Sequence, residues 1–338
     1  MVNNRIETRK VQKTGGSSYI VSLPKEWVIK NKIEKSDTLS IISQPDGNLL
    51  ITPKINPKES ILTKEIVVDD FDEYNFLFRV LIGAYVMGFS QIIIKSSKKF
   101  EPFIRDCVID FTQIVIGPEI IEESETYFLI KDLLNPKEMP FNRTIKRMYI
   151  IAETMHKDAL TALKTRDKAL AEDIIGRDND IDRLHWLIAR QSSIVLRDII
   201  LSQKLGISLD DAKHYQFMSK FLERIGDHAV KIAQNVLHII DVDLDENLIQ
   251  KIENASKVSI ELLNNSQEAR LKKDIKMANE NISRTQYLVK MCEGINIDSN
   301  TYSVETSIAL SYILESIRRT GEYSGDISEL VINNLLKE

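Results

Sequence analysis

One amphipathic stretch, residues 217–240, constrains the fold of this chain more than any other. Its apolar side chains recur at steps of three and four residues, which is the spacing of one face of an α-helix. They are Met218, Leu222, Ile225, Ala229, Ile232 and Val236. Just upstream, Ser208 and Asp211 have the spacing of a capping box at the start of a helix. The stretch therefore predicts a long amphipathic helix.

Glu223 and Asp227 lie four residues apart on this predicted helix, away from the centre of its apolar face. Side chains at that spacing project from the same face, so the two carboxylates would be neighbours and would repel each other. A bound cation would relieve the repulsion. The alternative, which an isolated pair of acids favours, is a solvated helix face on which Lys231 partly pairs with Asp227.

Residues 136–338 contain two series of three predicted helices that align with each other. The first repeat covers residues 142–240 and the second covers residues 246–337. Corresponding motifs are D-N-D-I-D-R-L (178–184) and N-E-N-I-S-R-T (279–285), then L-E-R-I-G-D-H-A (222–229) and I-R-R-T-G-E-Y-S (317–324). The middle helices of the repeats are expected at about 168–202 and at 270–293. Six helices with short connections predict a pair of three-helix bundles.

A second pair of acids changes the interpretation of Glu223 and Asp227. Asp178 and Asp182 also lie four residues apart, on the preceding helix, with His185 one turn further on. Four carboxylates on neighbouring helices form a hard oxygen site of the kind that Mg²⁺, Mn²⁺ or iron prefers. We therefore expect these four residues to bind one metal ion, whether Mg, Mn, Fe or Zn.

The second repeat has lost most of these ligands. Arg318 and Glu322 stand where the first repeat has its Glu and Asp, and Asn279 and Ser283 replace the two acids of the middle helix. A shift of four residues recovers a weaker pair, Glu322 and Asp326, but misaligns the apolar stripe. Because Arg318 beside Glu322 would itself stand in for a cation, we predict one metal site rather than two.

Residues 1–55 predict a small basic module of β-hairpins. The first hairpin turns at Gly15-Gly16 and the second at Asp46-Gly47, and Pro24 begins a short helix between them. Such a module cannot bury enough surface alone, so pairing with a second copy is expected. Residues 1–35 hold eight Lys or Arg against three Glu, on a chain of net charge −5. An anionic partner such as nucleic acid is therefore expected for this module alone.

This N-terminal module resembles the AbrB-type swapped-hairpin DNA-binding domains. The resemblance covers R-K-V-Q-K-T-G-G-S-S-Y-I-V-S-L-P-K-E-W (9–27), D-T-L-S-I (37–41) and D-G-N-L-L-I-T-P (46–53). Ser36 departs from the pattern, because that family usually has Gly before the Asp. The resemblance implies an interleaved homodimer whose basic first hairpin contacts DNA. The expected contacts are Arg5, Arg9, Lys10, Lys13, Ser17, Ser18 and Lys25.

The duplicated L-E-R-I-G-D-H-A helix is similar to that of the PhoU family of phosphate-uptake regulators, and this resemblance covers the whole C-terminal region. It implies that the E-x-x-x-D pairs bind metal ions on the surface of the bundle. An AbrB-like module joined to a PhoU-like region resembles the prokaryotic PhoU-type transcriptional regulators. The predicted fold class is therefore multidomain and mainly α.

The remaining features predict no chemistry. Residues 56–135 read as a small α/β segment of order β-α-β-α-β-β, followed by a linker up to Pro140. Four histidines are expected to be hydrogen-bonded or to face solvent: His156, His214, His228 and His238. No apolar run approaches the roughly 20 residues of a membrane span, there is no signal peptide, and the two cysteines lack metal-site spacing. The chain is expected in the cytoplasm, without membrane insertion.

Two functions remain open. The leading hypothesis is a homodimeric regulator that binds DNA through residues 1–55 and senses phosphate through the bundle, either by inorganic phosphate coordinating the metal or by contact with phosphate-transporter components or a sensor kinase. The other is an adaptor that acts through protein contacts, with the N-terminal module only a dimer clasp. A di-metal enzyme is disfavoured because its Glu-x-x-His motifs are missing and no nucleophile–base arrangement is visible, so we predict a non-enzyme.

Overall fold

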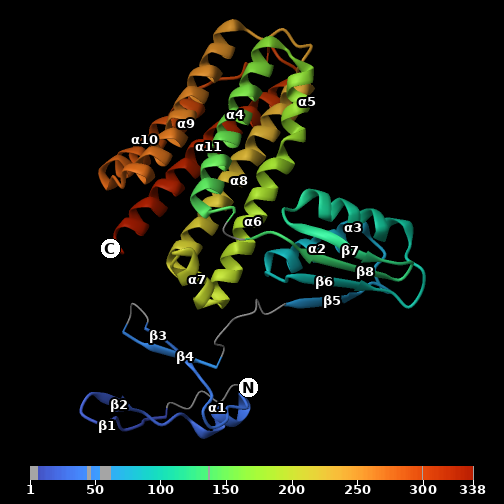
Figure 1. Ribbon diagram of the computed structural model, residues 1–338. Helices are drawn as coiled ribbons and strands as arrows, with labels where there is room; N and C mark the ends of the chain where they lie inside the picture. The colour runs from blue at the N-terminus through green and yellow to red at the C-terminus, as the bar shows by residue number, and fades with distance from the viewer. Residues whose placement is uncertain (1–6, 44–46, 54–61, 136–137, 299, 338) are drawn as a thin grey trace. The chain divides into compact units, whose positions relative to one another are not determined.

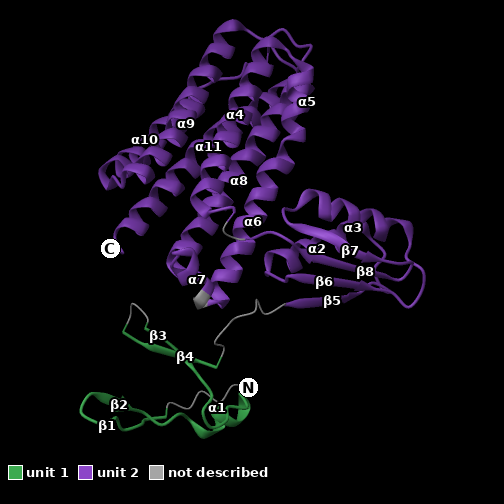
Figure 2. Cartoon of the chain, viewed as in Figure 1, with its two compact units in different colours: residues 1–60 green, residues 61–338 purple. Residues whose placement is uncertain are grey.

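The computed structural model describes residues 7–43, 47–53, 62–135, 138–298 and 300–337. The chain divides into two compact units, residues 1–60 and 61–338 (Figure 2). The predicted boundary at residue 55, Asp46 of the second turn and part of the linker before Pro140 fall outside the described residues. The α/β segment and the helical repeats belong to one unit.

The first unit consists of two antiparallel hairpins and a short helix. Its elements are β1 (Gln12–Thr14), β2 (Ser18–Ile20), α1 (Lys25–Lys30), β3 (Ser40–Ser43) and β4 (Leu49–Thr52). Gly15 and Gly16 have φ angles of 60° and 82°, which a tight hairpin turn requires and which glycine adopts without strain. None of the described residues of this unit is buried. The described part of a single copy therefore has no hydrophobic core.

The second unit begins with an α/β segment. Its elements are β5 (Thr63–Val67), α2 (Tyr74–Val86), β6 (Gln91–Lys95), α3 (Pro102–Ile114), β7 (Pro118–Glu123) and β8 (Tyr127–Asp132). The strands form one sheet in the order β5-β6-β8-β7, in which only the β5–β6 pair is parallel. Leu77 and Leu81 of α2 and Phe111 of α3 pack against Ile94 and Phe128 of the sheet. The predicted element order is confirmed.

The rest of the second unit is helical (Figure 1). The helices are α4 (Phe141–Thr165), α5 (Lys168–Gly176), α6 (Asp178–Arg197), α7 (Ile199–Leu205), α8 (Leu209–His238), α9 (Glu246–Lys272), α10 (Ile275–Glu293) and α11 (Val304–Leu335). Helix α8 packs against α4, α5, α6 and α11, so it lies at the centre of the bundle. The predicted Ser208–Asp211 capping box is present at its start. The prediction of a mainly helical chain is confirmed.

Two of the predicted helix bounds were wrong. The expected helix over residues 168–202 is three helices, α5, α6 and α7, and α9 continues to Lys272 rather than ending before Arg270. Capping accounts for the separate starts of α7 and α10. Asp198 accepts a hydrogen bond from the N–H of Leu201 at the start of α7, and Asp274 accepts one from Met277 at the start of α10. Both aspartates begin a new helix by satisfying its free N–H groups.

A buried arginine joins the α/β segment to the helices. Arg190 of α6 is 2% exposed, and its Nη2 lies 2.6 Å from Asp132 Oδ2 at the end of β8. Its Nη1 donates to the carbonyl of Tyr85, and its guanidinium lies over the Tyr85 ring. Such a contact needs both partners, because a lone buried charge would be strongly destabilising. Among the helices of the described chain, none is long and apolar enough to cross a membrane.

Candidate metal centre

The candidate centre lies where α6 and α8 approach each other closely. Gly226 of α8 faces Ile181 of α6, and a Cβ at position 226 would lie only 2.9 Å from Ile181 Cγ2. Glycine is therefore the residue that allows this approach. The next residue on each helix is an acid, Asp227 on α8 and Asp182 on α6. The close approach brings two predicted ligands together.

Asp178, Asp182 and Asp227 each place a carboxylate oxygen within 4.8 Å of the others. Oxygen ligands bind Mg²⁺ or Ca²⁺ at about 2.0–2.6 Å, so two ligands of one ion can be about 4–5 Å apart. The three aspartates are thus spaced to share one cation. Within the described residues, this is the one group of three or more such side chains that meets that spacing.

The electrostatics of the cluster follow from burial and crowding. All three aspartates are partly buried. Burial, together with the charges of Asp178 and Glu223, raises the pKa of Asp182 to about 7. Burial and neighbouring acids also raise the pKa values of Asp178 and Asp227. A buried oxygen of Asp178, Oδ1, has no hydrogen-bond partner among the described residues. A cation would stabilise the ionised form of all three acids.

Glu223, the fourth predicted ligand, lies beside the cluster but does not complete it. Its Oε1 accepts a hydrogen bond of 2.7 Å from Lys220, while Oε2 is buried and has no hydrogen-bond partner among the described residues. Arg224 balances part of the negative charge, with its Nη1 3.3 Å from Asp227 Oδ2. His185 Nδ1 is hydrogen-bonded to Ser219 Oγ at 3.0 Å. This histidine is not among the described ligands that meet the 4.8 Å spacing.

In the second repeat, arginines take the place of a cation. Arg318 forms ion pairs with Glu315 and Glu322, and Arg319 Nη1 lies 2.8 Å from the other oxygen of Glu322. Burial and the charges of Glu329 and Glu322 raise the pKa of Asp326. Gly321, which corresponds to Gly226, packs against Leu288 of α10 instead of bringing acids together. The weaker predicted pair, Glu322 and Asp326, is not part of a ligand cluster within the described residues.

Comparison with known proteins shows that this centre lies within a region that matches a known domain family. A model of the PhoU domain matches residues 145–236. The chain carries a PhoU domain. All four predicted metal ligands lie inside the matched residues. A model described as antidote-toxin recognition MazE, bacterial antitoxin, matches residues 12–59, which is the module likened above to AbrB-type domains. Both resemblances drawn from the sequence are therefore confirmed.

Curated relatives match a little over half of this chain. The chain is 26% identical to the phosphate-specific transport system accessory protein PhoU homolog of Caulobacter vibrioides over 193 residues, which is 55% of this chain and 83% of the relative. It is 21% identical to PhoU homolog 1 of Thermotoga maritima over 194 residues, covering 55% and 82%.

Solved structures show the same fold. The structure of PhoU from Pseudomonas aeruginosa superposes with a TM-score of 0.52 at 19% identity, covering 58% of this chain and 95% of that one. The phosphate transport system regulatory protein PhoU from Streptococcus pneumoniae gives a TM-score of 0.50 at 20% identity, with coverage of 59% and 94%. The helical region therefore has the PhoU fold.

Six of the seven predicted DNA-contacting side chains are described, and all six lie on the surface of the first unit. Arg9, Lys10, Lys13, Ser17, Ser18 and Lys25 are exposed. Lys13 is in β1, and Ser17 and Ser18 follow the glycine turn, so one hairpin carries three of them. Arg9 pairs with Glu7. Arg5 lies outside the described residues.

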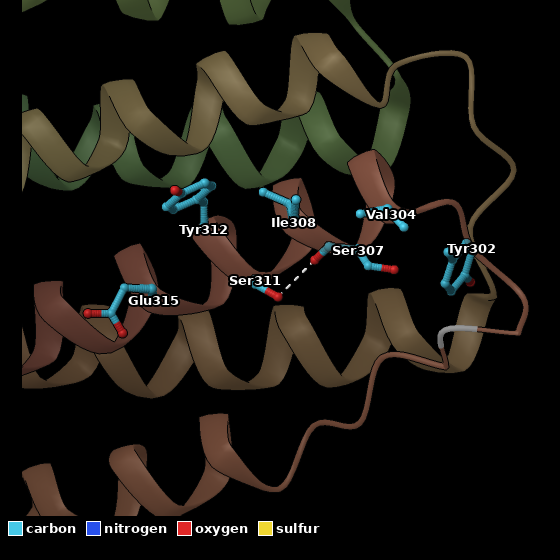
Figure 3. Close-up of a pocket in the computed structure, with 7 residues that line it drawn as sticks. All are labelled: Tyr302, Val304, Ser307, Ile308, Ser311, Tyr312 and Glu315. Carbon is cyan, nitrogen blue, oxygen red and sulfur yellow. Dashed lines mark hydrogen bonds between the residues drawn. The ribbon is translucent and has the colours of Figure 1, made fainter.

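A surface groove of about 620 Å³ beside the first half of α11 has a different character (Figure 3). Its exposed apolar side chains, Val304, Ile308 and Tyr312, lie one helical turn apart. Ser311 and Ser307 are joined by the hydrogen bond from Ser311 Oγ to the Ser307 carbonyl, and Glu315 contributes the one charge of the lining. A single carboxylate offers no paired ligands, so the groove is not part of the metal centre.

Proposed function

We propose that this chain is a phosphate-responsive transcriptional regulator, which binds DNA through residues 1–55 and receives its signal through the metal-binding PhoU domain. The observation that carries the proposal is the union, in one chain, of an exposed basic hairpin module with a PhoU domain. The two parts lie in separate compact units. A signal domain and a DNA-binding domain are the components that such a regulator needs.

Phosphate is the proposed signal because of the relatives. The matched curated proteins are named as accessory proteins of a phosphate-specific transport system. We extend that process to this chain, with transporter components or a sensor kinase as its protein partners in the cytoplasm. In this proposal the clustered aspartates bind a metal ion and the basic hairpin binds DNA, so neither group has a catalytic role.

The N-terminal module is proposed to act as a homodimer. Tyr19, Ile29, Ile41 and Leu49 are all more than 60% exposed, which is unfavourable for large apolar side chains of an isolated module. A second copy would cover such residues and create a shared core. Dimerisation would also bring two basic hairpins to one DNA duplex, which raises the affinity for DNA.

The metal is proposed to sit among Asp178, Asp182 and Asp227, with Glu223 able to join after release from Lys220. A bound cation of charge two or three would offer open positions to a phosphate oxygen. Lys220 and Arg224 at the edge of the cluster would attract the same anion. The chain's own residues would therefore hold both the ion and its anionic ligand.

The second candidate function is an adaptor whose N-terminal module is only a dimer clasp. The exposed apolar residues of that module favour it, because they require dimerisation whether or not DNA binds. DNA affinity of the full chain distinguishes the two functions. We expect selection from genomic fragments to yield a bound sequence, with an affinity that falls steeply as salt rises. Absence of binding to any fragment, or an affinity independent of salt, would support the adaptor instead.

A further inference from the structure

A polar pocket of about 310 Å³ lies at the end of the bundle where α4 and α8 begin and α9 and α11 end. Its walls come from both repeats, with Asn142 and His214 from the first and Arg270 and Lys337 from the second. The volume is near the lower limit of about 300 Å³ for small-molecule sites. A ligand held here would touch both repeats at once.

Positive charge dominates the pocket. Among the described lining residues, Arg270, Lys273 and Lys337 are basic and Asp211 is the one acid. That carboxylate is already occupied, because Oδ1 lies 2.6 Å from Lys337 Nζ while Oδ2 accepts from Ser208 at the helix cap. Concave sites with charges of one sign concentrate ions of the opposite sign. The pocket therefore favours an anion.

Arg270 has donors left to offer. Its Nη1 donates to Asn142 Oδ1 at 3.0 Å, and the Tyr215 hydroxyl donates to the same oxygen at 2.7 Å. These two contacts fix the guanidinium and the amide in place. The Nε of Arg270 is buried and has no hydrogen-bond partner within the described residues. A buried unpaired donor is destabilising, so an acceptor supplied by a ligand would be stabilising.

His214 is a second polar side chain of the pocket that lacks a hydrogen bond within the described residues. It is 9% exposed, contacts the Tyr215 ring, and makes no hydrogen bond to a described residue. Burial and the charges of Lys337 and Arg270 lower its pKa to about 4. The imidazole is thus neutral at pH 7 and still offers one N–H. The basic side chains also interact favourably with the dipoles at the C-termini of α9 and α11. That interaction explains neither the unpaired Arg270 Nε nor the placement of His214 in the pocket.

We propose that this pocket binds a small oxyanion of the phosphate class. Arg270, Lys273 and Lys337 supply charge, and Arg270 Nε, His214 and the Asn142 amide supply directed hydrogen bonds. A guanidinium suits phosphate because its planar N–H groups match pairs of phosphate oxygens. The pocket would give the regulator a direct ligand at a place other than the metal centre, and its link to phosphate sensing rests on the proposed function.

The test is calorimetric titration of the full chain with inorganic phosphate at constant ionic strength, with chloride as the reference anion. We expect saturable binding, and at least a tenfold loss of affinity in Arg270→Gln. Lys273→Gln should also weaken binding, whereas Lys272→Gln should not. Lys272 is the adjacent residue, so its substitution removes the same charge. It pairs with Glu268 and does not line the pocket. Circular dichroism checks that each variant is folded.

Two further arms define the ligand and its place. A nucleoside monophosphate that binds more tightly than inorganic phosphate would identify a phosphorylated molecule as the source of the oxyanion, and weaker binding would identify free phosphate. Phosphate affinity that survives both chelation and Asp227→Asn supports the pocket. Affinity lost in Asp227→Asn would move the ligand to the metal centre and overturn the inference while leaving the proposed function standing. No saturable binding, or equal effects of Lys272→Gln and Lys273→Gln, would overturn it as well.

Discussion

Gly226 of α8 packs against Ile181 of α6 so closely that an added Cβ would lie 2.9 Å from Ile181 Cγ2. On each helix the next residue is a candidate metal ligand, Asp227 and Asp182 respectively. The packing of the two helices and the geometry of the centre are therefore one feature. A change that separates the helices separates the ligands.

Gly226→Ala is expected to lower both stability and metal affinity. The Cγ2 methyl of Ile181 belongs to a β-branched side chain, which is held to one χ1 rotamer in a helix. The helices are therefore expected to move apart, at about 1–3 kcal/mol. Urea unfolding and elemental analysis measure the two effects. The matched control is Gly83→Ala in α2, where nothing lies within 4 Å of the new Cβ and the protein should gain about 0.5–1 kcal/mol. Similar results for both variants would show that the approach is not needed.

Asp227→Asn should lower the metal content of protein purified without chelator, with at least about a tenfold loss of affinity. The same variant should raise the stability of the metal-free protein, because it removes one of three crowded charges. Glu322→Gln is the control in the second repeat, where Arg318 and Arg319 already balance the charge. Equal metal loss in both variants would contradict a single site, and wild-type protein without metal would contradict the centre itself.

Replacement of Arg9, Lys10 and Lys13 by Ala should flatten the salt dependence of DNA binding. Each phosphate contact that is lost lowers the slope of log affinity against log salt by about 0.9, because fewer counterions are released. Fluorescence anisotropy at several salt concentrations gives the slope. A triple substitution of Lys98, Lys99 and Arg105, which are exposed in the α/β segment, removes equal charge and should leave the slope unchanged. A slope that does not change in the first variant would place the DNA contacts elsewhere.

A shortened chain that begins at Leu62 keeps the whole α/β segment and the helices, including the Arg190–Asp132 ion pair. If residues 1–55 form the dimer, this chain should sediment as a monomer under conditions in which the full chain is a dimer. Analytical ultracentrifugation over a range of concentrations provides the comparison. A shortened chain that remains a dimer would locate an interface in the second unit.

The buried His156 is expected to make the folded protein less stable as the pH is lowered. The residue is fully buried, bonded to Ser256, and its burial lowers the pKa to about 4 from an ordinary 6.5. The unfolded chain therefore binds more protons, so the free energy of unfolding should fall as pH decreases from about 6.5 to about 4. His156→Gln should reduce that slope by up to about 1.4 kcal/mol per pH unit. His238→Gln, which removes an exposed imidazole, is the control. Identical slopes in wild type and His156→Gln would rule out this source.

The sequence by itself determined most of the elements and their order, but not the division of residues 168–202 into three helices. The three- and four-residue spacing of apolar side chains located α8, the Ser208–Asp211 spacing located its start, and the glycine turn located the first hairpin. The same spacing placed each pair of acids on one helix face. These features depend on neighbours in the chain, so local patterns are sufficient to read them. The missed helix starts at Asp198 and Asp274 also had local signals, the capping aspartates themselves.

Only the tertiary structure decided which of these side chains meet. Asp178, Asp182 and Asp227 converge, whereas Glu223 pairs with Lys220. The sequence pattern did not distinguish Glu223 from the three aspartates. The Arg190–Asp132 contact and the pocket around Arg270 join residues 58 and more positions apart. Such contacts depend on how closely two helices approach and which rotamer each side chain adopts there, and the periodicity of a single helix contains neither.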